Sequence, residues 1–267
     1  MSRSRRFLVP LVLHTLVLAL ASRAAEPSKE VRKTIPLPAG GRVEVKTYKG
    51  SVDVTAEERS DVDVEARVTP DTTCGDAKAE ARWVDETEIR IESHAAGVRI
   101  ETNYDELTAL HPWLFGGCTA RPFVAYRIRM PRKADLEVKD YKSKIDLSGV
   151  TGDLRLESYK GTMSVRDLTG SVRLKTYKGE ASVAFALLRG ESRVETYKGD
   201  VRVSLPKTAA FDLDADCGRR GAFRSDFDGV LSASGRTRMV LNGGGPKLAL
   251  STHRGTLKLS ARREDLP

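Results

Sequence analysis

Three aspartates near the C-terminus have the residue type and spacing of metal ligands. Asp212, Asp214 and Asp216 alternate with apolar residues, so a strand would carry all three carboxylates on one face, where their oxygens could bind calcium. The same alternation is typical of an ordinary strand with one exposed face, and we favour that interpretation. The sequence therefore predicts no metal site and no cofactor.

Other patterns that carry catalytic chemistry are missing from the sequence. It contains no Gly-x-Ser-x-Gly, His-Glu-x-x-His or Cys-x-x-Cys motif and no phosphate-binding loop. His94, His111 and His253 do not stand at ligand spacing from one another. We expect a protein that is not an enzyme. A carbohydrate-active β-helix enzyme is the less favoured alternative, because it would need a cleft of clustered carboxylates that the repeats do not display.

A tripeptide, Tyr-Lys-Gly, recurs along the chain, and its central copies begin 18, 18 and 20 residues apart. Alternating apolar and polar residues flank each copy, which predicts a short half-buried strand on either side of a glycine corner. Of 24 equivalent apolar sites, only Ser192 is polar. The copies begin at Tyr48, Tyr159, Tyr177 and Tyr197, with a near match at Tyr141-Lys142-Ser143 and a more distant one at His253-Arg254-Gly255.

The repeats determine the expected fold. One unit cannot bury its apolar side alone, whereas stacked units bury a continuous core. We therefore predict an all-β fold, a single-stranded parallel β-solenoid (β-helix-like) with about 18–20 residues per coil and an irregular N-terminal half. Equivalent strands would stack about 4.8 Å apart. The alternative is an antiparallel sandwich of hairpins through the Tyr-Lys-Gly turns, which the near-constant spacing disfavours.

The remaining segments are less regular. Residues 110–115, Leu-His-Pro-Trp-Leu-Phe, lie in an insertion that we expect to cap one end of the solenoid, the alternative being a binding lip with an exposed aromatic tip. We divide the chain into a signal peptide (1–24), a linker and entry to the first strand (25–41), an N-terminal β region with the insertion (42–130), regular solenoid repeats (131–261) and a tail (262–267).

The N-terminus has the pattern of a signal peptide. Arg3, Arg5 and Arg6 precede an apolar run over residues 7–20, and small residues lead to a predicted cleavage site after Ala24. The run is shorter than the roughly 20 residues of a transmembrane helix, so a retained anchor is the less favoured alternative. Cleavage would lower the formal net charge from +8 to +4, with 41 basic against 37 acidic residues. We expect a periplasmic, cell-surface or secreted protein that does not bind nucleic acid.

Two features carry a family resemblance. The first is the series of apolar-x-apolar strands and glycine corners from Leu136 to Val203, entered by a Met130-Pro131 step. The second is the final segment, residues 241–252, which reads Leu-Asn-Gly-Gly-Gly-Pro-Lys-Leu-Ala-Leu-Ser-Thr. Together they resemble the bacterial putative-adhesin family of β-strand-repeat proteins, a domain of unknown function, over roughly residues 31–259. The resemblance implies an envelope or secreted β-solenoid, and it brings no catalytic residues.

The tripeptide copies would form an exposed column in the stacked repeats, because strand alternation places each tyrosine on the outside. A regular cationic row bordered by aromatic faces suits an anionic polysaccharide or lipid surface. Alternatively, the tyrosines stack for stability alone, while Asp140, Glu180 and Asp200 neutralise the lysines. A further interpretation is a structural scaffold that self-associates or contacts an envelope protein. The candidate ligand-binding residues are Tyr141, Lys142, Tyr159, Lys160, Tyr177, Lys178, Tyr197 and Lys198.

The pairing of the three cysteines depends on the compartment in which the protein folds. An exported protein folds in an oxidising space, where cysteines pair. Cys74 and Cys118 both lie among turn-like residues and bracket the irregular segment, so we predict a disulfide between them. Cys217 lies on the apolar side of its strand and would remain a buried thiol. The alternative is that no disulfide forms.

Overall fold

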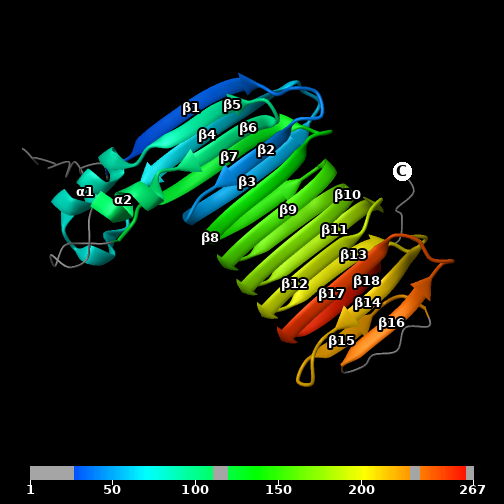
Figure 1. Ribbon diagram of the computed structural model, residues 1–267. Coiled ribbons are helices and arrows are strands. Elements are labelled where there is room, and N and C mark those ends of the chain that lie inside the picture. The colour runs from blue at the N-terminus through cyan, green and yellow to red at the C-terminus, as the bar shows by residue number, and fades with distance from the viewer. Residues whose placement is uncertain (1–26, 111–119, 229–234, 263–267) are drawn as a thin grey trace, which may run out of the picture.

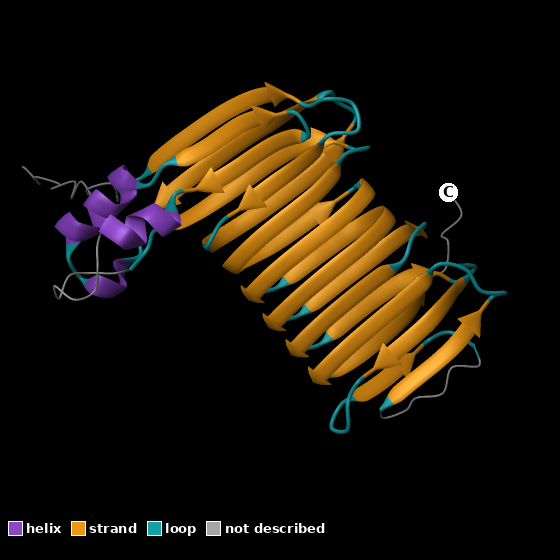
Figure 2. Ribbon diagram, in the orientation of Figure 1, coloured by secondary structure: helices purple, strands orange, loops and turns teal. Residues whose placement is uncertain are grey.

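The computed structural model describes residues 27–110, 120–228 and 235–262, which form a long stack of strands with short helices at one end (Figure 1; Figure 2). The strands lie in two layers, because each repeat runs along one layer, turns at a corner and returns along the other. The predicted signal peptide, residues 111–115 of the insertion, Cys118 and most of the predicted tail lie outside the described residues.

The first layer contains the strands that lead into the Tyr-Lys-Gly corners. Nearly all of its neighbouring strands are parallel; the exceptions are the outermost pairs, β5–β6 and β14–β16. In spatial order it consists of β5 (Ile89–His94), β6 (Gly97–Thr102), β2 (Arg42–Lys46), the first half of β8 (Asp135–Ser148), β9 (Thr151–Lys160), the second half of β10 (Met163–Lys178), β12 (Ser192–Lys198), β17 (Lys247–Arg254), β14 (Phe211–Asp216) and β16 (Arg236–Leu241).

The second layer contains the strands that leave the corners. Its antiparallel pairs, β1–β4 and β4–β7, lie together at the N-terminal end of the stack. In spatial order it consists of β1 (Lys29–Pro36), β4 (Asp61–Thr69), β7 (Phe123–Pro131), β3 (Lys49–Glu57), the second half of β8, the first half of β10, β11 (Ala181–Leu188), β13 (Val201–Pro206), β18 (Thr256–Arg262) and β15 (Ala222–Ser225).

The register follows the sequence repeat. Leu136 pairs with Leu154, and Leu154 pairs with Val172, so residues one repeat apart are direct neighbours in parallel strands. The predicted parallel, in-register stacking is therefore confirmed, and the antiparallel hairpin sandwich is wrong for these repeats. A parallel neighbour requires a crossover, and here the return strand in the opposite layer provides it.

The order of the repeats in space differs from a coil that winds in sequence order. The β2–β3 repeat lies between the β6–β7 pair and β8, and the β17–β18 repeat lies between the β12–β13 pair and the β14–β15 pair (Figure 1). The fold is thus mostly β, with a mixed and largely parallel strand arrangement in which one repeat near each terminus is inserted out of order.

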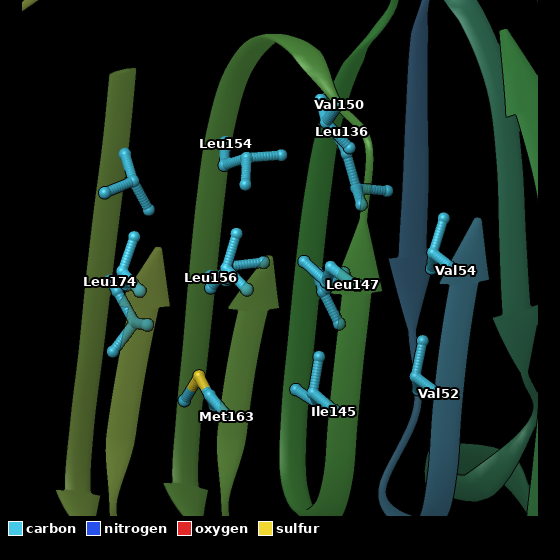
Figure 3. Packing of buried hydrophobic residues seen from close by; sticks show 14 of the residues in the cluster. Val52, Val54, Leu136, Ile145, Leu147, Val150, Leu154, Leu156, Met163 and Leu174 are labelled. Carbon is cyan, nitrogen blue, oxygen red and sulfur yellow. The ribbon is translucent and has the colours of Figure 1, made fainter. Parts of the chain in front are cut away.

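The core fills the space between the two layers. Leucines of the first layer, such as Leu154 and Leu156, face Ile145, Leu147 and Met163 of the second (Figure 3). All five are at most 2% exposed, as the period-2 alternation requires. Ser192 is also fully buried, and its hydroxyl accepts a hydrogen bond from Val172 N (3.1 Å) and donates one to Gly190 O (3.2 Å). The polar exception in the repeat pattern is thus satisfied by hydrogen bonds.

Helices interrupt the β structure between residues 72 and 110. A 3-10 turn (Thr72–Cys74), α1 (Ala77–Glu86) and α2 (Tyr104–Leu110) lie beside one corner at the N-terminal end of the stack (Figure 2). Asp76 caps α1 by accepting hydrogen bonds from Lys78 N and Ala79 N, and α1 buries Trp83 and Val84. The repeat pattern gives no indication of these helices, because they lie in the irregular segment outside the repeats. Neither helix has the length and apolar character of a membrane crossing within the described residues.

Candidate functional site

Six aromatic rings stack along one corner of the fold. Their centroids are 4.6–5.0 Å apart and successive ring planes lie within 10° of parallel. The spacing equals that of neighbouring strands, because each ring occupies the same position in an in-register repeat. We call this column the aromatic ladder; it consists of Tyr48, Tyr141, Tyr159, Tyr177, Tyr197 and His253.

The ladder lies on the surface, where strand alternation places it. Tyr141, Tyr159, Tyr177 and Tyr197 are each 38–40% exposed. The tyrosines stack as expected, with their ring faces against one another, so the ladder presents ring edges rather than aromatic faces to solvent. A ligand beside it therefore meets the partly positive ring edges rather than the π faces.

Residues from the irregular segments cover the N-terminal end of the ladder. The ring of Tyr104 lies 5.6 Å from that of Tyr48 at a tilt of 51°, and the Arg121 guanidinium lies 4.2 Å from the Tyr48 centroid. The Tyr104 hydroxyl donates to Pro122 O at 2.7 Å. Burial raises the pKa of Tyr104, so this phenol stays protonated. Neither Tyr104 nor Arg121 belongs to a repeat, so the repeat pattern does not indicate that they contact the ladder.

The glycine of each tripeptide is required by the close approach of neighbouring corners. Gly199 has φ of +142°, and a Cβ built there would lie 1.9 Å from Gly179 O. No side chain fits this position, and the left-handed backbone also disfavours one. Glycine therefore recurs for packing, whereas the tyrosine and lysine that precede it are not demanded by the backbone.

A row of buried polar side chains lies beneath the ladder, at the residue before each tyrosine. Thr196 Oγ1 donates to Gly179 O (3.2 Å), and Thr252 Oγ1 donates to Gly199 O (3.0 Å). These bonds connect adjacent corners from the inside. The signal in the sequence is the serine or threonine that precedes nearly every ring of the ladder.

In the Tyr141-Lys142-Ser143 copy, the residue before the tyrosine is Asp140, so a carboxyl group stands in place of this hydroxyl. Asp140 accepts hydrogen bonds from Ser143 N (2.7 Å), Ser143 Oγ (2.6 Å) and Ser158 Oγ (2.8 Å). Burial raises the pKa of Asp140, although these hydrogen bonds act in the opposite direction. Asp140 thus belongs to the internal network rather than to the exposed surface.

A row of cations follows the aromatic ladder at the next residue of each repeat. The strand pairing brings Lys142 beside Lys160, Lys160 beside Lys178, and Lys178 beside Lys198. The Lys178 and Lys198 ammonium groups lie 5.7 and 5.9 Å from the centroids of the preceding tyrosines. We call this set the corner cation row; it consists of Lys142, Lys160, Lys178, Lys198 and Arg254.

Lys49 departs from this row, although it occupies the equivalent position. Its side chain is only 11% exposed, forms an ion pair with Asp71, and lies 3.9 Å above the Phe123 ring. Lys49 thus connects the first repeat to the irregular segment. Its ammonium group is already paired with Asp71, so it does not add to the exposed charge of the row.

The corner cation row makes no ion pair with any other described residue. In the alternative interpretation Asp140, Glu180 and Asp200 neutralise the row, but none of these three acids forms an ion pair with it. Glu180 and Asp200 both pair with Arg202, at 2.6 and 3.2 Å, and Asp140 bonds to Ser143 and Ser158. Five neighbouring cations therefore face solvent without a carboxylate within ion-pair distance in the described structure.

The aspartates considered as metal ligands lie in a salt-bridged strand. Asp214 accepts two hydrogen bonds from Arg236, at 2.7 and 2.6 Å, and these bonds lower the pKa of Asp214. Across residues 27–110, 120–228 and 235–262, no three His, Cys, Asp or Glu side chains are grouped so as to hold a metal ion. All three aspartates lie on the outward face of β14, where their neighbours in the strand are buried.

The cysteines are only partly described. Cys118 lies outside the described residues, so the Cys74–Cys118 disulfide stays a prediction. Cys217 is fully buried, and its thiol donates to Gly235 O at 3.3 Å.

The part of the chain that carries most of the aromatic ladder matches a known family of sequences. Residues 131–260 match the family described as Toastrack DUF4097, and the match contains the tripeptide copies from Tyr141 to His253. The resemblance inferred from the sequence is confirmed over these residues. No curated protein matches the chain.

Solved bacterial structures are also similar to the chain. A "putative cell adhesion protein" from Clostridium sporogenes is 15% identical, with a TM-score of 0.49, over 88% of this chain and 100% of that one. A "putative adhesin" from Bacteroides fragilis is 9% identical, with a TM-score of 0.31, over 88% and 97% of the two chains. Another from Parabacteroides merdae is 8% identical, with a TM-score of 0.21, over 86% and 96%.

Proposed function

We propose that this chain, whose residues 131–260 belong to the Toastrack DUF4097 family, is an exported, non-catalytic protein that binds an anionic envelope or extracellular polymer along its corner cation row. In this proposal the repeats of residues 131–206 act as a solenoid-like coil that sets the spacing of the charges. The signal-peptide pattern of residues 1–24 supports export to the periplasm, the cell surface or the medium.

The observation that carries the proposal is the series of five neighbouring cations without an ion pair among the described residues. Unit charges about 4.8 Å apart repel by roughly 0.9 kcal/mol in water, a cost that any neutral polar residue would avoid. The backbone requires glycine at the next position but places no such demand on the lysines. A ligand with regularly spaced negative charges would offset this repulsion.

The ligand would be held by many weak contacts. Each exposed lysine contributes about 0.2–1 kcal/mol to an ion pair, and the contacts add because one chain carries them all. The Lys178 and Lys198 ammonium groups lie 5.7 and 5.9 Å from the centroids of the preceding tyrosines, whose phenol hydroxyls can donate hydrogen bonds to carboxylate, sulfate or phosphate oxygens. Binding is expected to weaken with salt, since these charges lie at the surface.

The test replaces three lysines of the row, as K160Q/K178Q/K198Q. Binding to polygalacturonate and to phosphatidylglycerol vesicles is measured at low and high ionic strength, with circular dichroism as the check of folding. We expect affinity for at least one of the two probes to fall roughly tenfold or more at low ionic strength.

The matched control, K78Q/K133Q/K258Q, removes the same charge from three exposed lysines elsewhere and should reduce binding much less. Equal losses in the two variants would indicate a nonspecific charge effect, and unchanged affinity in K160Q/K178Q/K198Q would leave the row with a purely structural role. Loss for vesicles but not for polygalacturonate would assign the row to an anionic lipid surface.

A specific observation favours self-association as the second candidate. Among the described strands, β1 pairs only with β4 and β16 pairs only with β14, so both ends of the stack present a strand edge. Unpaired edges are templates for strand addition. Light scattering over a range of protein concentrations tests this candidate: a mass that rises with concentration supports end-to-end assembly, and a constant monomer mass excludes it.

A further inference from the structure

A pocket lies at the N-terminal end of the corner cation row, where the row meets the irregular segment. Its volume is about 440 Å³, within the roughly 300–1,000 Å³ of sites for small ligands. Lys142 and Lys160, the first two cations of the row, line the pocket together with Thr73 and Arg121 from outside the repeats. The pocket therefore joins the charges of the row to side chains of different origin.

The positive row does not continue past this pocket. The strand neighbour of Lys142 on this side is Lys49, whose ammonium group pairs with Asp71 and lies above the neutral ring of Phe123. Part of the lining comes from the 3-10 turn (Thr72–Cys74) and from residues 120 and 121, none of which belongs to a repeat. A linear ligand that lies along the row would therefore end at this pocket.

The pocket has a net positive charge. Its lining contains four cations, Lys49, Arg121, Lys142 and Lys160, and one carboxylate, Asp71, which leaves a formal charge of +3. Cations that surround a hollow attract an anion more strongly than the same cations along an open edge, because less water screens them. The pocket is thus the part of the row that is best suited to a single anionic group.

Arg121 favours a planar anion in this pocket. Its guanidinium lies 4.2 Å from the Tyr48 centroid, and the Tyr48 ring in turn stacks on Tyr141. A guanidinium has five N–H donors in a fixed fork that matches the two oxygens of a carboxylate, so it can hold a carboxylate beside its other contacts. Thr73, Tyr48 and Tyr141 line the same pocket, and their hydroxyls can form hydrogen bonds with sugar hydroxyls.

We propose that this pocket binds the end unit of an acidic polysaccharide, with the carboxylate of the last sugar held by Arg121, Lys142 and Lys160. The inference rests on the proposed function, because the rest of the polymer would follow the row toward Arg254. An open row would bind a polymer anywhere along its length and in either direction. A row that is closed at one end sets one direction and one register, so the protein would recognise chain ends.

The first probe is digalacturonate, which is too short to follow the row. We expect one digalacturonate to bind per protein in calorimetric titrations at low ionic strength, and the neutral disaccharide digalactose not to bind. T73W fills the pocket without changing its charge, so the dissociation constant for digalacturonate should rise tenfold or more. T72W is the matched control, because Thr72 is the exposed neighbour that does not line the pocket, and its dissociation constant should stay within about twofold of wild type.

The second probe is polygalacturonate in short and long fractions. End recognition predicts one protein bound per polymer chain in both fractions, whereas binding along the row alone predicts a number that rises with chain length. Such a rise, absence of digalacturonate binding, equal affinity for digalactose, unchanged affinity in T73W or an equal loss in T72W would each overturn the pocket as an end site. K178Q/K198Q changes the row outside the pocket. Unchanged polygalacturonate affinity in that variant would instead contradict the proposed function, so the two failures are distinguishable.

Discussion

The imidazole of His253 stacks on the ring of Tyr197, with centroids 4.8 Å apart and planes 7° from parallel. Strands β13, β14, β15 and β16 lie between these two residues in sequence, yet β12 and β17 are direct neighbours in space. The last repeat is therefore inserted beside the Tyr197 repeat and extends the aromatic ladder. The ladder is a property of the three-dimensional order of the repeats rather than of their order along the chain.

Replacing a central ring should destabilise the fold. Tyr177 stacks on both Tyr159 and Tyr197 at 5.0 Å, so Y177A removes two ring contacts at once. With about 0.5–1.5 kcal/mol per aromatic pair, we expect the free energy of unfolding to fall by about 2 kcal/mol in denaturant titrations. Y177F keeps both contacts and should stay within about 0.5 kcal/mol of the wild type. Equal stability of Y177A and wild type would show that the ladder does not stabilise the protein.

The corner glycines should not tolerate even a methyl group. In G199A the new Cβ would lie 1.9 Å from Gly179 O, which is backbone and cannot move without separating two paired repeats. We expect a loss of about 3 kcal/mol or more in unfolding free energy. Gly40 is the matched control, because it also has a positive φ but its Cβ would meet nothing within 4 Å. G40A should cost only about 1–2 kcal/mol; a similar loss in both variants would contradict the close-approach argument.

Much of the fold and of the ladder follows from local spacing. The alternation around each corner identifies the buried residues, and the 18-residue interval identifies which residues pair, as Leu136 and Leu154 do. Together they also place Tyr159 and Lys160 beside their equivalents in the next repeat. These features depend on residues close in sequence, which is why they could be predicted.

Other features depend on contacts that the repeat pattern does not encode. The repeat pattern does not specify that β17, rather than β14, lies beside β12, because both strands have the same alternation of apolar and polar residues. The pairing of Lys49 with Asp71 joins a repeat to the irregular segment. Glu180 and Asp200 form ion pairs with Arg202 rather than with the lysines. Arg202 lies on β13, the strand that leaves the corner, and the spacing of the Tyr-Lys-Gly copies does not indicate it as their partner.

The predicted Cys74–Cys118 disulfide should be found in protein purified from an oxidising compartment. It would close a loop of 45 residues and contribute roughly 4 kcal/mol on the chain-entropy argument. Peptide mapping without reductant should yield the linked Cys74 and Cys118 peptides, with Cys217 alkylated only after unfolding because its thiol is buried. Recovery of Cys74 and Cys118 both alkylated in the native protein would refute the pairing.

Asp140 should make stability depend on pH in an uncommon direction. Burial raises its pKa in the folded protein, whereas in the unfolded chain the value is near 3.9. A carboxyl group with a raised pKa stabilises the fold while it is protonated, so this contribution is fully present below the unfolded value. It is lost as the pH rises through the folded pKa. The wild-type free energy of unfolding, minus that of D140N, should therefore decrease between about pH 3 and pH 7.

The measurement is a set of denaturant titrations of both proteins at matched pH values, together with the carboxyl carbon shift of Asp140 followed by NMR. Subtracting D140N removes the pH dependence of all other groups, because the variant keeps them and lacks only this ionisation. An increasing difference with pH would mean that the bonds from Ser143 and Ser158 to the carboxylate outweigh its burial. In that case Asp140 would hold a stabilising negative charge beneath the ladder, and its side chain would partly balance the lysines above it.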